Sequence, residues 1–414
     1  MRNAAGLIAV VAFAGALGLA SAPARSDALP AMPVAWDSAA LDSMVRAIAD
    51  RQRLVSRGGW PTVPDGPSMR PEMTDARVPA LRQRLAASGD MSKDDAAATG
   101  DRVDPAVVAA VGRFQSRHGL VVDGIAGRKT VETMNVSAAD RATQLMVNYD
   151  RLRVLARSLP ATGLVVNIPA ATVQLMVDGR VALTSRVIVG QRGWPTPLLE
   201  GTVGEIELNP YWNVPTRIAR LELLPKIAAQ PAFLAVNNMR VLGGPNGAAE
   251  TPPSSVDWSR FLQLGYRLRQ DPGRDNPLGK IKFVFPNRYD VFLHDTPSRS
   301  AFERPDRTLS HGCIRVERAF DLAVKLLAAD PAWTATSLQA AIDTGRTQPV
   351  KLARPMPIHT VYITAWVAAD GIVQFRRDAY GRDAAEAAGR AAAATAVVSA
   401  CGSTSAALDS ADRG

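Results

Sequence analysis

The spacing of apolar residues changes at Pro160, and this change limits the folds that the chain can adopt. Between Ser137 and Leu159 the apolar residues recur at the three- and four-residue spacing of an amphipathic helix. Pro160 ends that pattern, because proline has no amide hydrogen to donate. Downstream, short runs rich in apolar and β-branched residues are typical of strands, and Asp178-Gly179 between two of them predicts a hairpin. We therefore predict an α+β protein, helical up to residue 160 and mostly β after it.

The first residues have the pattern of a secretory leader. Arg2 precedes an apolar run over 4–20, and the following Ser-Ala-Pro-Ala has the small-x-small form of a signal-peptidase site. We expect residues 1–24 to be a signal peptide, cleaved after Ala24, and the protein to be exported. No other run reaches the roughly 18 apolar residues that a membrane helix needs, so we expect no stable membrane span after cleavage.

Residues 25–160 are the predicted helical scaffold. It opens with a helix over 39–54. Later, Asp104 can cap a helix that has Pro105 at its first position and Gly119 at its end. With 414 residues and 47% hydrophobic content, the chain can bury one core here and another in a second domain.

The main β-rich domain is predicted over residues 161–350. Strands over 280–285 and 289–293 would place His294 at the end of the second strand. Residues 214–277 instead mix helical stretches with Pro- and Gly-rich pieces. This mixture indicates an insertion that could form a lid over a site built on the sheet.

The C-terminal residues are predicted to extend that domain. Strands over 361–368 and 372–375 would form a hairpin around Asp370-Gly371, within a β-hairpin extension over 351–383. Residues 384–414 form an Ala-rich tail. The tail contains Cys401, whose function the sequence does not indicate.

Cys313 is the strongest candidate for a reactive side chain. The chain has two cysteines and four histidines, and His294 and His311 lie within twenty residues upstream of Cys313. An exported thiol whose only potential disulfide partner is distant in sequence is better explained by chemistry than by packing. A nearby imidazole raises the thiolate fraction of a cysteine. Gly312 would allow a tight turn in which its own amide and that of Cys313 point at an oxyanion.

The formal net charge of the chain is +9. This excess of positive charge favours binding to a polyanionic surface such as the bacterial envelope or wall. The basic residues show no spaced pattern with aromatic residues, so the sequence does not indicate a nucleic-acid-binding protein.

The string Ser310-His311-Gly312-Cys313, with sixteen residues between His294 and His311, resembles the motif of the YkuD-type L,D-transpeptidases of the bacterial envelope. This resemblance implies a YkuD-type catalytic domain, a location in the periplasm in association with the cell wall, and no metal or organic cofactor. Further segments resemble the large YcbB-like branch of the family, namely NPYWNVP, RQDPGRDNPLGKIKF, LHDTP, LSHGCIRVE and YITAWVAADGIVQFRRDAYGRD.

The resemblance also implies roles for individual residues. Cys313 would be the nucleophile and His294 its general base, with the Gly312 and Cys313 amides as the oxyanion hole. Ser310 and His311 would shape the site. Arg315 stands where many relatives carry asparagine, and it would orient either the loop or a substrate carboxylate. Substrate contacts are expected from three aromatic residues near or in the insertion, namely Tyr211, Trp212 and Trp258, although packing in the core or lid explains the two tryptophans equally well.

The reaction that the resemblance implies is cross-linking of peptidoglycan stem peptides. Cys313 would attack the amide before the terminal D-alanine of a tetrapeptide stem, release D-alanine and form a thioester. An amine of a second stem in the sacculus would resolve this thioester into a cross-link between third residues. Trimming by water and exchange of D-amino acids are the other outcomes, and acylation of Cys313 by carbapenems is a further expectation.

A second resemblance covers the helical scaffold at about residues 75–136. This segment resembles the peptidoglycan-binding type 1 module, a three-helix wall-binding domain. A helical spacer that binds nothing is the alternative. The matching residues are Leu81, Leu85, Val111, Phe114, Gln115, Gly119, Leu120, Asp123, Gly124, Gly127 and Thr130.

Three alternatives stand beside the transpeptidase. A papain-like cysteine endopeptidase of the cell wall would place its histidine after the cysteine, and His359 alone meets that order. A noncatalytic peptidoglycan-binding scaffold would have no need of Cys313, His294 and Gly312 together. A zinc site of His294, His311 and Cys313 lacks a second cysteine or a short histidine spacing.

Overall fold

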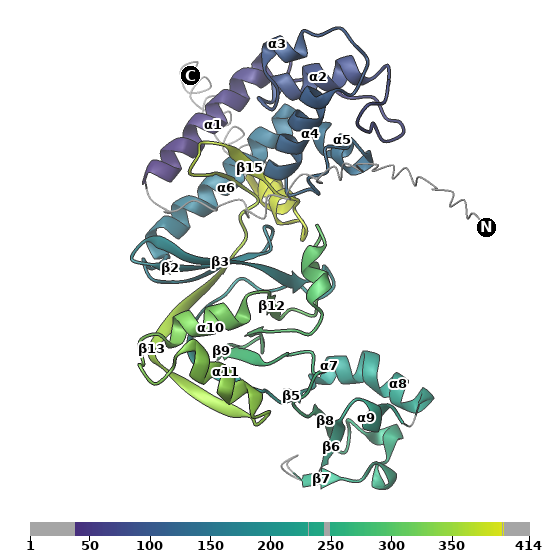
Figure 1. Ribbon diagram of the computed structural model, residues 1–414, viewed down its shortest axis with the longest axis vertical. Coiled ribbons are helices and arrows are strands. Elements are labelled where there is room, and N and C mark those ends of the chain that lie inside the picture. Colours follow the sequence, from purple (N-terminus) through teal and green to yellow (C-terminus); the bar gives the residue numbers. More distant parts are fainter. Residues whose placement is uncertain (1–37, 231, 244–248, 391, 393–414) are drawn as a thin grey trace, which may run out of the picture.

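The computed structural model describes residues 38–230, 232–243, 249–390 and 392. The predicted signal peptide, Cys401 and most of the Ala-rich tail lie outside the described residues. A helical part, a β-rich domain and a smaller insertion follow one another along the longest axis of the molecule (Figure 1). Over the described part of the chain, no helix is long and apolar enough to cross a membrane.

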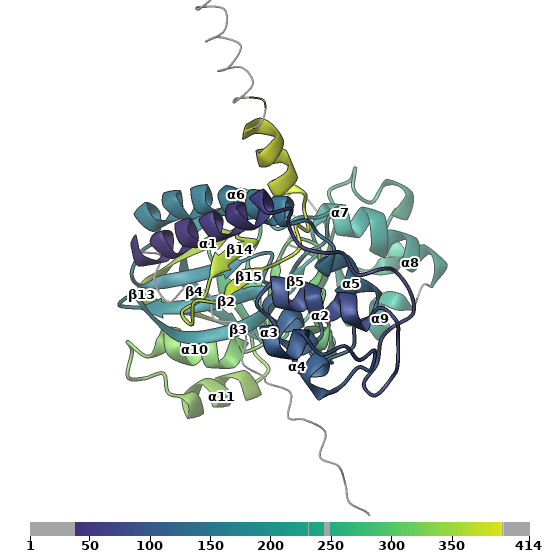
Figure 2. The same ribbon diagram turned by 90° about the horizontal axis from the view of Figure 1, so that it is seen from above.

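Helices form the N-terminal part, as the apolar spacing predicts. The longest two, α1 and α6, lie side by side (Figure 2). Helix α6 begins after its N-cap Ser137, whose hydroxyl accepts a hydrogen bond from the Asp140 amide, and it ends before Leu159 and Pro160. The helices are α1 (Ser38–Ser56), α2 (Val78–Ala87), α3 (Lys93–Ala96), α4 (Pro105–Arg117), α5 (Arg128–Met134) and α6 (Ala138–Ser158).

Helices α2, α4 and α5 enclose a small core of their own. The predicted cap of α4 is confirmed, because the Asp104 carboxylate accepts a hydrogen bond from the Val107 amide and Pro105 is the first helical residue. Gly119, just past the end of α4, has φ +66°, a conformation that favours glycine. The buried residues of this core include Val78, Leu81, Leu85, Val107, Val111, Phe114, Val131 and Met134.

The β-rich domain is a nine-stranded sheet in the order β11-β3-β12-β10-β9-β4-β13-β1-β2, and a pairing between β2 and β3 closes it on itself. Closure leaves fewer free strand edges. The predicted hairpin joins β2 to β3, with Asp178 at φ +50° and Gly179 at φ +74°. The strands are β1 (Gly163–Asn167), β2 (Thr172–Val177), β3 (Arg180–Gly190), β4 (Glu200–Leu208), β9 (Ile281–Val284), β10 (Leu293–His294), β11 (Thr308–Ser310), β12 (Ile314–Val316) and β13 (Gln348–Val361).

Two layers of helices cover this sheet. Helices α10 (Ala319–Leu327) and α11 (Ala335–Asp343) share the main apolar core, which includes Ile206, Phe283, Leu293 and Ile314. Helices α1 and α6 pack on the opposite side (Figure 2), together with the hairpin of β14 (Ala365–Val367) and β15 (Val373–Phe375). The helical part is therefore joined to the sheet through a continuous apolar core.

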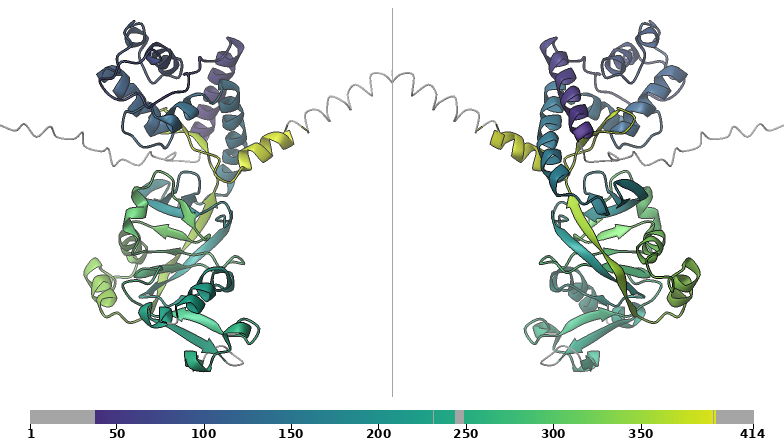
Figure 3. Two further views of the ribbon diagram at one scale, coloured as in Figure 1. Left: turned by 90° about the vertical axis from the view of Figure 1, so that its right-hand side faces the viewer. Right: turned by 90° about the vertical axis from the view of Figure 1, so that its left-hand side faces the viewer.

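The insertion predicted over 214–277 begins slightly earlier, at β5, and folds around its own core. It contains a four-stranded sheet, β5-β8-β6-β7, which the sequence did not predict. It lies at the end of the molecule opposite the helical part (Figure 3). Its elements are β5 (Trp212–Asn213), α7 (Thr216–Ile218), a π-helical turn (Ala219–Leu223), α8 (Leu224–Ala229), α9 (Phe233–Val236), β6 (Met239–Gly243), β7 (Ala249–Thr251) and β8 (Arg267–Gln270).

Two predicted strands differ from the observed ones. The strand expected over 289–293 is mostly irregular, because the Asn287 side chain accepts hydrogen bonds from the Tyr289 and Val291 amides and Asp290 has φ +52°. Only the last residue, Leu293, enters β10. The strand expected from Val361 to residue 368 is interrupted as well. β13 ends at Val361 and crosses residue 350, the predicted end of the β-rich domain.

Candidate active site

Four polar side chains stand in one row across the sheet. Glu207 of β4 lies opposite Lys282 of β9, Lys282 lies opposite His294 of β10, and His294 lies beside Arg315 of β12. Directly paired residues of adjacent strands project from the same face of a sheet. Their strand neighbours, which include Phe283, Leu293 and Ile314, project from the other face into the main core. The alternation of apolar and polar residues therefore gathers these four side chains outside the core.

Cys313 lies in the turn between β11 and β12, two residues before Arg315. Its thiol is half-buried, and Sγ donates to the Asp290 carbonyl oxygen at 3.8 Å. Burial raises the pKa of this thiol to about 11, although the backbone of Phe292 and the charges of Lys282 and Arg315 act to lower it. The free protein thus carries a protonated thiol at neutral pH, whereas the sequence had suggested an enriched thiolate.

His294 is buried, and its ring has a defined tautomer. Nδ1 lies 2.5 Å from the Asp295 carbonyl oxygen, which can only accept, so Nδ1 carries the proton and Nε2 keeps its lone pair. Burial, with a smaller contribution from the charge of Arg315, lowers the pKa of this imidazole to about 3. His294 is therefore a neutral base. The Asp295 carboxylate accepts hydrogen bonds from the Lys280 amide and from Arg299, and so stabilises the turn after β10.

The residues before Cys313 form a tight hydrogen-bonded turn. The Ser310 hydroxyl donates to the Cys313 carbonyl at 2.5 Å and accepts from the Gly312 amide at 3.2 Å. Gly312 has φ +112°, where a side chain would be strained. The Gly312 amide, expected in an oxyanion hole, is thus already engaged. Within the described part of the chain, the Cys313 amide has no hydrogen-bond partner and can receive an oxyanion.

His311 connects the turn to the insertion. Its Nε2 lies 2.6 Å from Oε1 of Glu222, which belongs to the π-helical turn of the insertion. Its ring meets Trp194 edge-on at a centroid distance of 4.8 Å. The Arg217 guanidinium lies 3.6 Å from the centroid of the same tryptophan. The insertion therefore contacts the turn before Cys313 directly.

Arg315 is a cation without an acidic partner. Its side chain is half-buried, burial lowers its pKa, and it forms no hydrogen bond or ion pair with any residue that the structure describes. By contrast, Lys282 Nζ lies 3.0 Å from Glu207 Oε2. Of the two cations in the row, Arg315 is thus the one available to an anionic ligand.

The aromatic residues expected to contact substrate lie in or beside the insertion. Trp212 and Trp258 pack against the core of the insertion, and Trp258 stacks on Phe261. The ring of Tyr211 is covered by the Arg269 guanidinium at 4.4 Å. The contacts of the two tryptophans match the packing alternative, and a role in substrate binding stays a prediction for all three residues.

Sequence reasoning missed Lys282, Trp194 and Glu222. Lys282 had a signal, because it stands alone between two apolar residues of a predicted strand. Trp194 lies in a Gly- and Pro-rich loop, where a large aromatic residue is unusual. Nothing in the local sequence pointed to Glu222, since its partner is 89 residues away.

A large cleft lies apart from this row of side chains. This cleft of about 2080 Å³ runs between the helical part and the sheet, lined among others by Val121, Arg307, Glu317 and Arg376, and Cys313 is not part of its lining. No group of three or more His, Cys, Asp or Glu side chains suited to hold a metal ion is present among the residues described.

Comparison with known proteins agrees with both resemblances. Residues 161–341 match the YkuD family model, described as "L,D-transpeptidase catalytic domain", and residues 74–134 match PG_binding_1, described as "Putative peptidoglycan binding domain". A curated protein of Haemophilus influenzae named "Putative L,D-transpeptidase" is 35% identical over 262 residues, which cover 62% of this chain and 52% of that protein. The chain thus spans about half the length of this relative.

Solved structures of L,D-transpeptidases are also similar to parts of the chain. One from Mycobacterium smegmatis is 17% identical, and the match covers 48% of this chain and 57% of that one, with a TM-score of 0.23. One from Stackebrandtia nassauensis has 12% identity, coverage of 73% and 96%, and a TM-score of 0.25. A third, in complex with imipenem, has 17% identity, coverage of 49% and 59%, and a TM-score of 0.23.

Assignment to the YcbB-like branch stays a prediction. At the level of domains the family matches are plain. The chain contains a YkuD-type L,D-transpeptidase catalytic domain over residues 161–341 and a peptidoglycan-binding type 1 module over residues 74–134.

Proposed function

We propose that the protein is a peptidoglycan L,D-transpeptidase that forms cross-links between third residues of stem peptides. One observation carries this proposal. Within the region that matches the catalytic family, a neutral imidazole and the Arg315 cation project from one face of the sheet, beside the turn that carries the thiol. Among the described residues, the imidazole Nε2, the guanidinium and the Cys313 backbone amide have no hydrogen-bond partner. These are the groups that acyl transfer through a thioester needs.

The first half-reaction uses Cys313 and His294 in their neutral forms. Nε2 of His294 takes the thiol proton as Sγ attacks the carbonyl carbon before the terminal D-alanine. The carbonyl oxygen becomes an oxyanion and accepts a hydrogen bond from the Cys313 amide. The C–N bond then breaks, His294 returns the proton to the leaving nitrogen, and D-alanine departs from a thioester on Cys313.

The second half-reaction resolves the thioester. An amine of a second stem attacks the thioester carbonyl, and Nε2 of His294 takes a proton from the attacking nitrogen. The C–S bond breaks, and the same proton returns to sulfur as the new amide is released. Water in place of the amine gives trimming, and a free D-amino acid gives exchange.

Arg315 binds the terminal carboxylate of the donor stem. The charges of Arg315 and the Cys313 thiolate influence the pKa of each other, so the guanidinium lies near the sulfur. The D-alanine carboxylate is the anion of the stem closest to the scissile bond. A half-buried arginine without an acidic partner supports this assignment, because it can form charge-assisted hydrogen bonds with that carboxylate.

The protein acts in the periplasm at the cell wall. The module over 74–134 holds the catalytic domain on the sacculus, which the match to a peptidoglycan-binding family supports. Carbapenems acylate Cys313 in the same way as a stem, because a strained β-lactam carbonyl meets the same nucleophile and amide. The imipenem complex of a similar L,D-transpeptidase supports this expectation.

Mass spectrometry of the protein with disaccharide tetrapeptide tests the proposal. Wild type should release D-alanine, form dimers and carry a thioester adduct on Cys313. Cys313→Ala should do none of these, whereas Cys401→Ala, which removes the other cysteine, should behave as wild type. Equal behaviour of wild type and Cys313→Ala would refute the transpeptidase function. Pelleting of Cys313→Ala with intact sacculi tests the binding module separately.

A further inference from the structure

The backbone amide of Cys313 belongs to a peptide group whose carbonyl, that of Gly312, accepts a hydrogen bond. Thr196 Oγ1 donates a hydrogen bond to the Gly312 carbonyl at 2.8 Å. That carbonyl and the Cys313 N–H are parts of one planar peptide group, and in a trans peptide they point in opposite directions. Whatever fixes the Gly312 carbonyl therefore also fixes the direction of the Cys313 N–H.

Thr196 is itself rigidly placed. It is fully buried, and its hydroxyl accepts a hydrogen bond from the Gly190 amide at 2.9 Å. The loop that carries it lies directly against β3, since a Cβ on Gly190 would come within 2.0 Å of the Trp194 carbonyl oxygen. No residue with a side chain fits at Gly190 without moving this loop.

The C-terminal extension holds the same loop through Tyr380. Its hydroxyl donates to the Gly190 carbonyl at 2.5 Å and accepts from the Thr196 amide at 3.2 Å. The backbone amide of Tyr380 donates to the Tyr362 hydroxyl at 2.8 Å, which in turn donates to Asp378 at 2.7 Å. A single tyrosine thus joins the extension to β3 and to the Thr196 loop.

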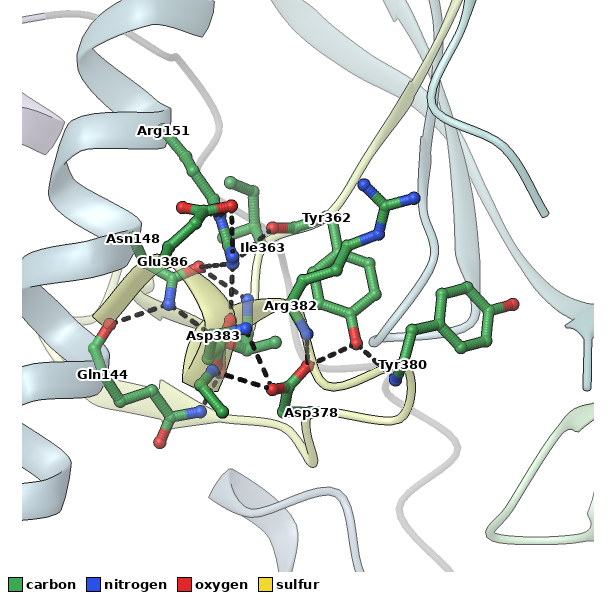
Figure 4. Close-up of polar contacts among 12 residues, drawn as sticks. Gln144, Asn148, Arg151, Tyr362, Ile363, Asp378, Tyr380, Arg382, Asp383 and Glu386 are labelled. Carbon is green, nitrogen blue, oxygen red and sulfur yellow. Dashed lines mark hydrogen bonds and ion pairs between the residues drawn. The ribbon is translucent and has the colours of Figure 1, made fainter. Parts of the chain in front are cut away.

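The extension is in turn anchored on helix α6. Asp383 pairs with Arg151 at 2.6 Å, and Asn148 exchanges hydrogen bonds with Thr364. Figure 4 shows this polar cluster, with the ring of Tyr380 pointing away from it. A continuous series of hydrogen bonds therefore runs from the helical part through Tyr380 and Thr196 to the peptide group beside the nucleophile.

We propose that Thr196 is a positioning residue that aims the Cys313 amide at the oxyanion, and that Tyr380 holds Thr196 in place from the C-terminal extension. The inference rests on the acyl transfer proposed above. It assigns both residues to the formation of the tetrahedral intermediate rather than to the reactivity of the thiol.

Thr196→Val tests the assignment, because it removes the hydroxyl and keeps the shape. Acyl-enzyme formation from the tetrapeptide should slow by about 10- to 100-fold, since a misdirected oxyanion donor loses much of its effect. Alkylation of Cys313 by iodoacetamide has no oxyanion, so its rate and pH profile should stay within about twofold of wild type. Thr196→Ser should restore most of the acylation rate.

Tyr380→Phe should slow acylation less than Thr196→Val. The double variant should be no slower than Thr196→Val alone, because both changes act on one hydrogen-bonded unit. Matched controls are Thr172→Val, at a buried threonine whose hydroxyl has no partner among the described residues, and Tyr149→Phe on α6. Both should acylate as wild type. Circular dichroism at the assay temperature checks that each variant is folded.

The outcomes separate this inference from the proposed function. Wild-type acylation in Thr196→Val, or an equal fall of acylation and alkylation, would overturn the positioning role. If wild type fails to react with the tetrapeptide, the proposed function fails. Wild type and Thr196→Val are then compared with p-nitrophenyl acetate, because attack of the thiol on this ester also forms an oxyanion. If that ester does not acylate Cys313 either, both proposals fall.

Discussion

Nε2 of His311 lies 2.6 Å from Oε1 of Glu222, and this contact joins the turn before Cys313 to the insertion. Glu222 belongs to a π-helical turn, a conformation that is rare and often found at functional sites. The insertion is therefore a structural part of the candidate site as well as a predicted cover for it.

Glu222→Ala should lower kcat/KM for the tetrapeptide by about tenfold, because His311 loses its support and the turn before Cys313 loosens. Both side chains are about a third exposed, so the pair adds at most about 1 kcal/mol to stability. Steady-state kinetics with thermal melts would check this. Glu250→Ala removes another exposed carboxylate of the insertion, and an equal effect there would contradict the role of Glu222.

Gly312→Ala should abolish most acyl transfer. At φ +112° an alanine is strained, so the turn would relax and redirect the Cys313 amide. We expect acylation to fall by at least about 100-fold. Gly193→Ala, where a Cβ meets open space, is the control and should acylate as wild type. Normal acylation in Gly312→Ala would show that the turn tolerates another conformation.

The pH dependence of Cys313 alkylation reports the state of the free thiol. Burial raises the pKa of Cys313 to about 11, so only the small thiolate fraction reacts at neutral pH. The rate should rise about tenfold per pH unit from pH 7 to 10 without levelling off. A plateau beginning near pH 6 or 7 would instead indicate a preformed thiolate and imidazolium pair.

Arg315→Met should raise KM for the tetrapeptide by about tenfold, the loss of one charge-assisted hydrogen-bonded contact of about 1.4 kcal/mol. A tetrapeptide whose terminal carboxylate is amidated should bind wild type and variant equally. Arg318→Met removes an exposed arginine paired with Asp321 and should leave KM unchanged. If Arg315→Met still binds the free-acid tetrapeptide better than the amidated one, the carboxylate binds to a residue other than Arg315.

Asp90→Ala should destabilise the helical part by about 3–5 kcal/mol, because it leaves Arg117 buried without its counter-charge. The buried arginines Arg84 and Arg141 lie close enough to Arg117 to add repulsion. Urea unfolding followed by circular dichroism would measure the loss. Asp50→Ala removes an exposed pair with Arg53 and should change the midpoint little. Similar midpoints for both variants would mean that the Asp90 pair is not stabilising.

Local patterns predicted the elements that depend on local interactions. Helix α6, the Asp104 cap and the hairpin at Asp178-Gly179 were correct, because capping, proline and turn chemistry act within a few residues. The strand expected over 289–293 was wrong. There the Asn287 side chain competes with strand pairing for the backbone amides. The spacing of hydrophobic residues does not reveal that competition.

Cys313, His294 and the glycine turn could be proposed as a candidate site from the sequence alone, because they lie within twenty residues of one another and their types suit acyl transfer. Only the tertiary structure decided what surrounds them. Sheet register placed Lys282 and Arg315 on either side of His294. Chain folding brought in Glu222 from 89 residues away and Thr196 from 116. Burial set the direction of both pKa shifts, since desolvation depends on what covers a group and not on its neighbours in the chain.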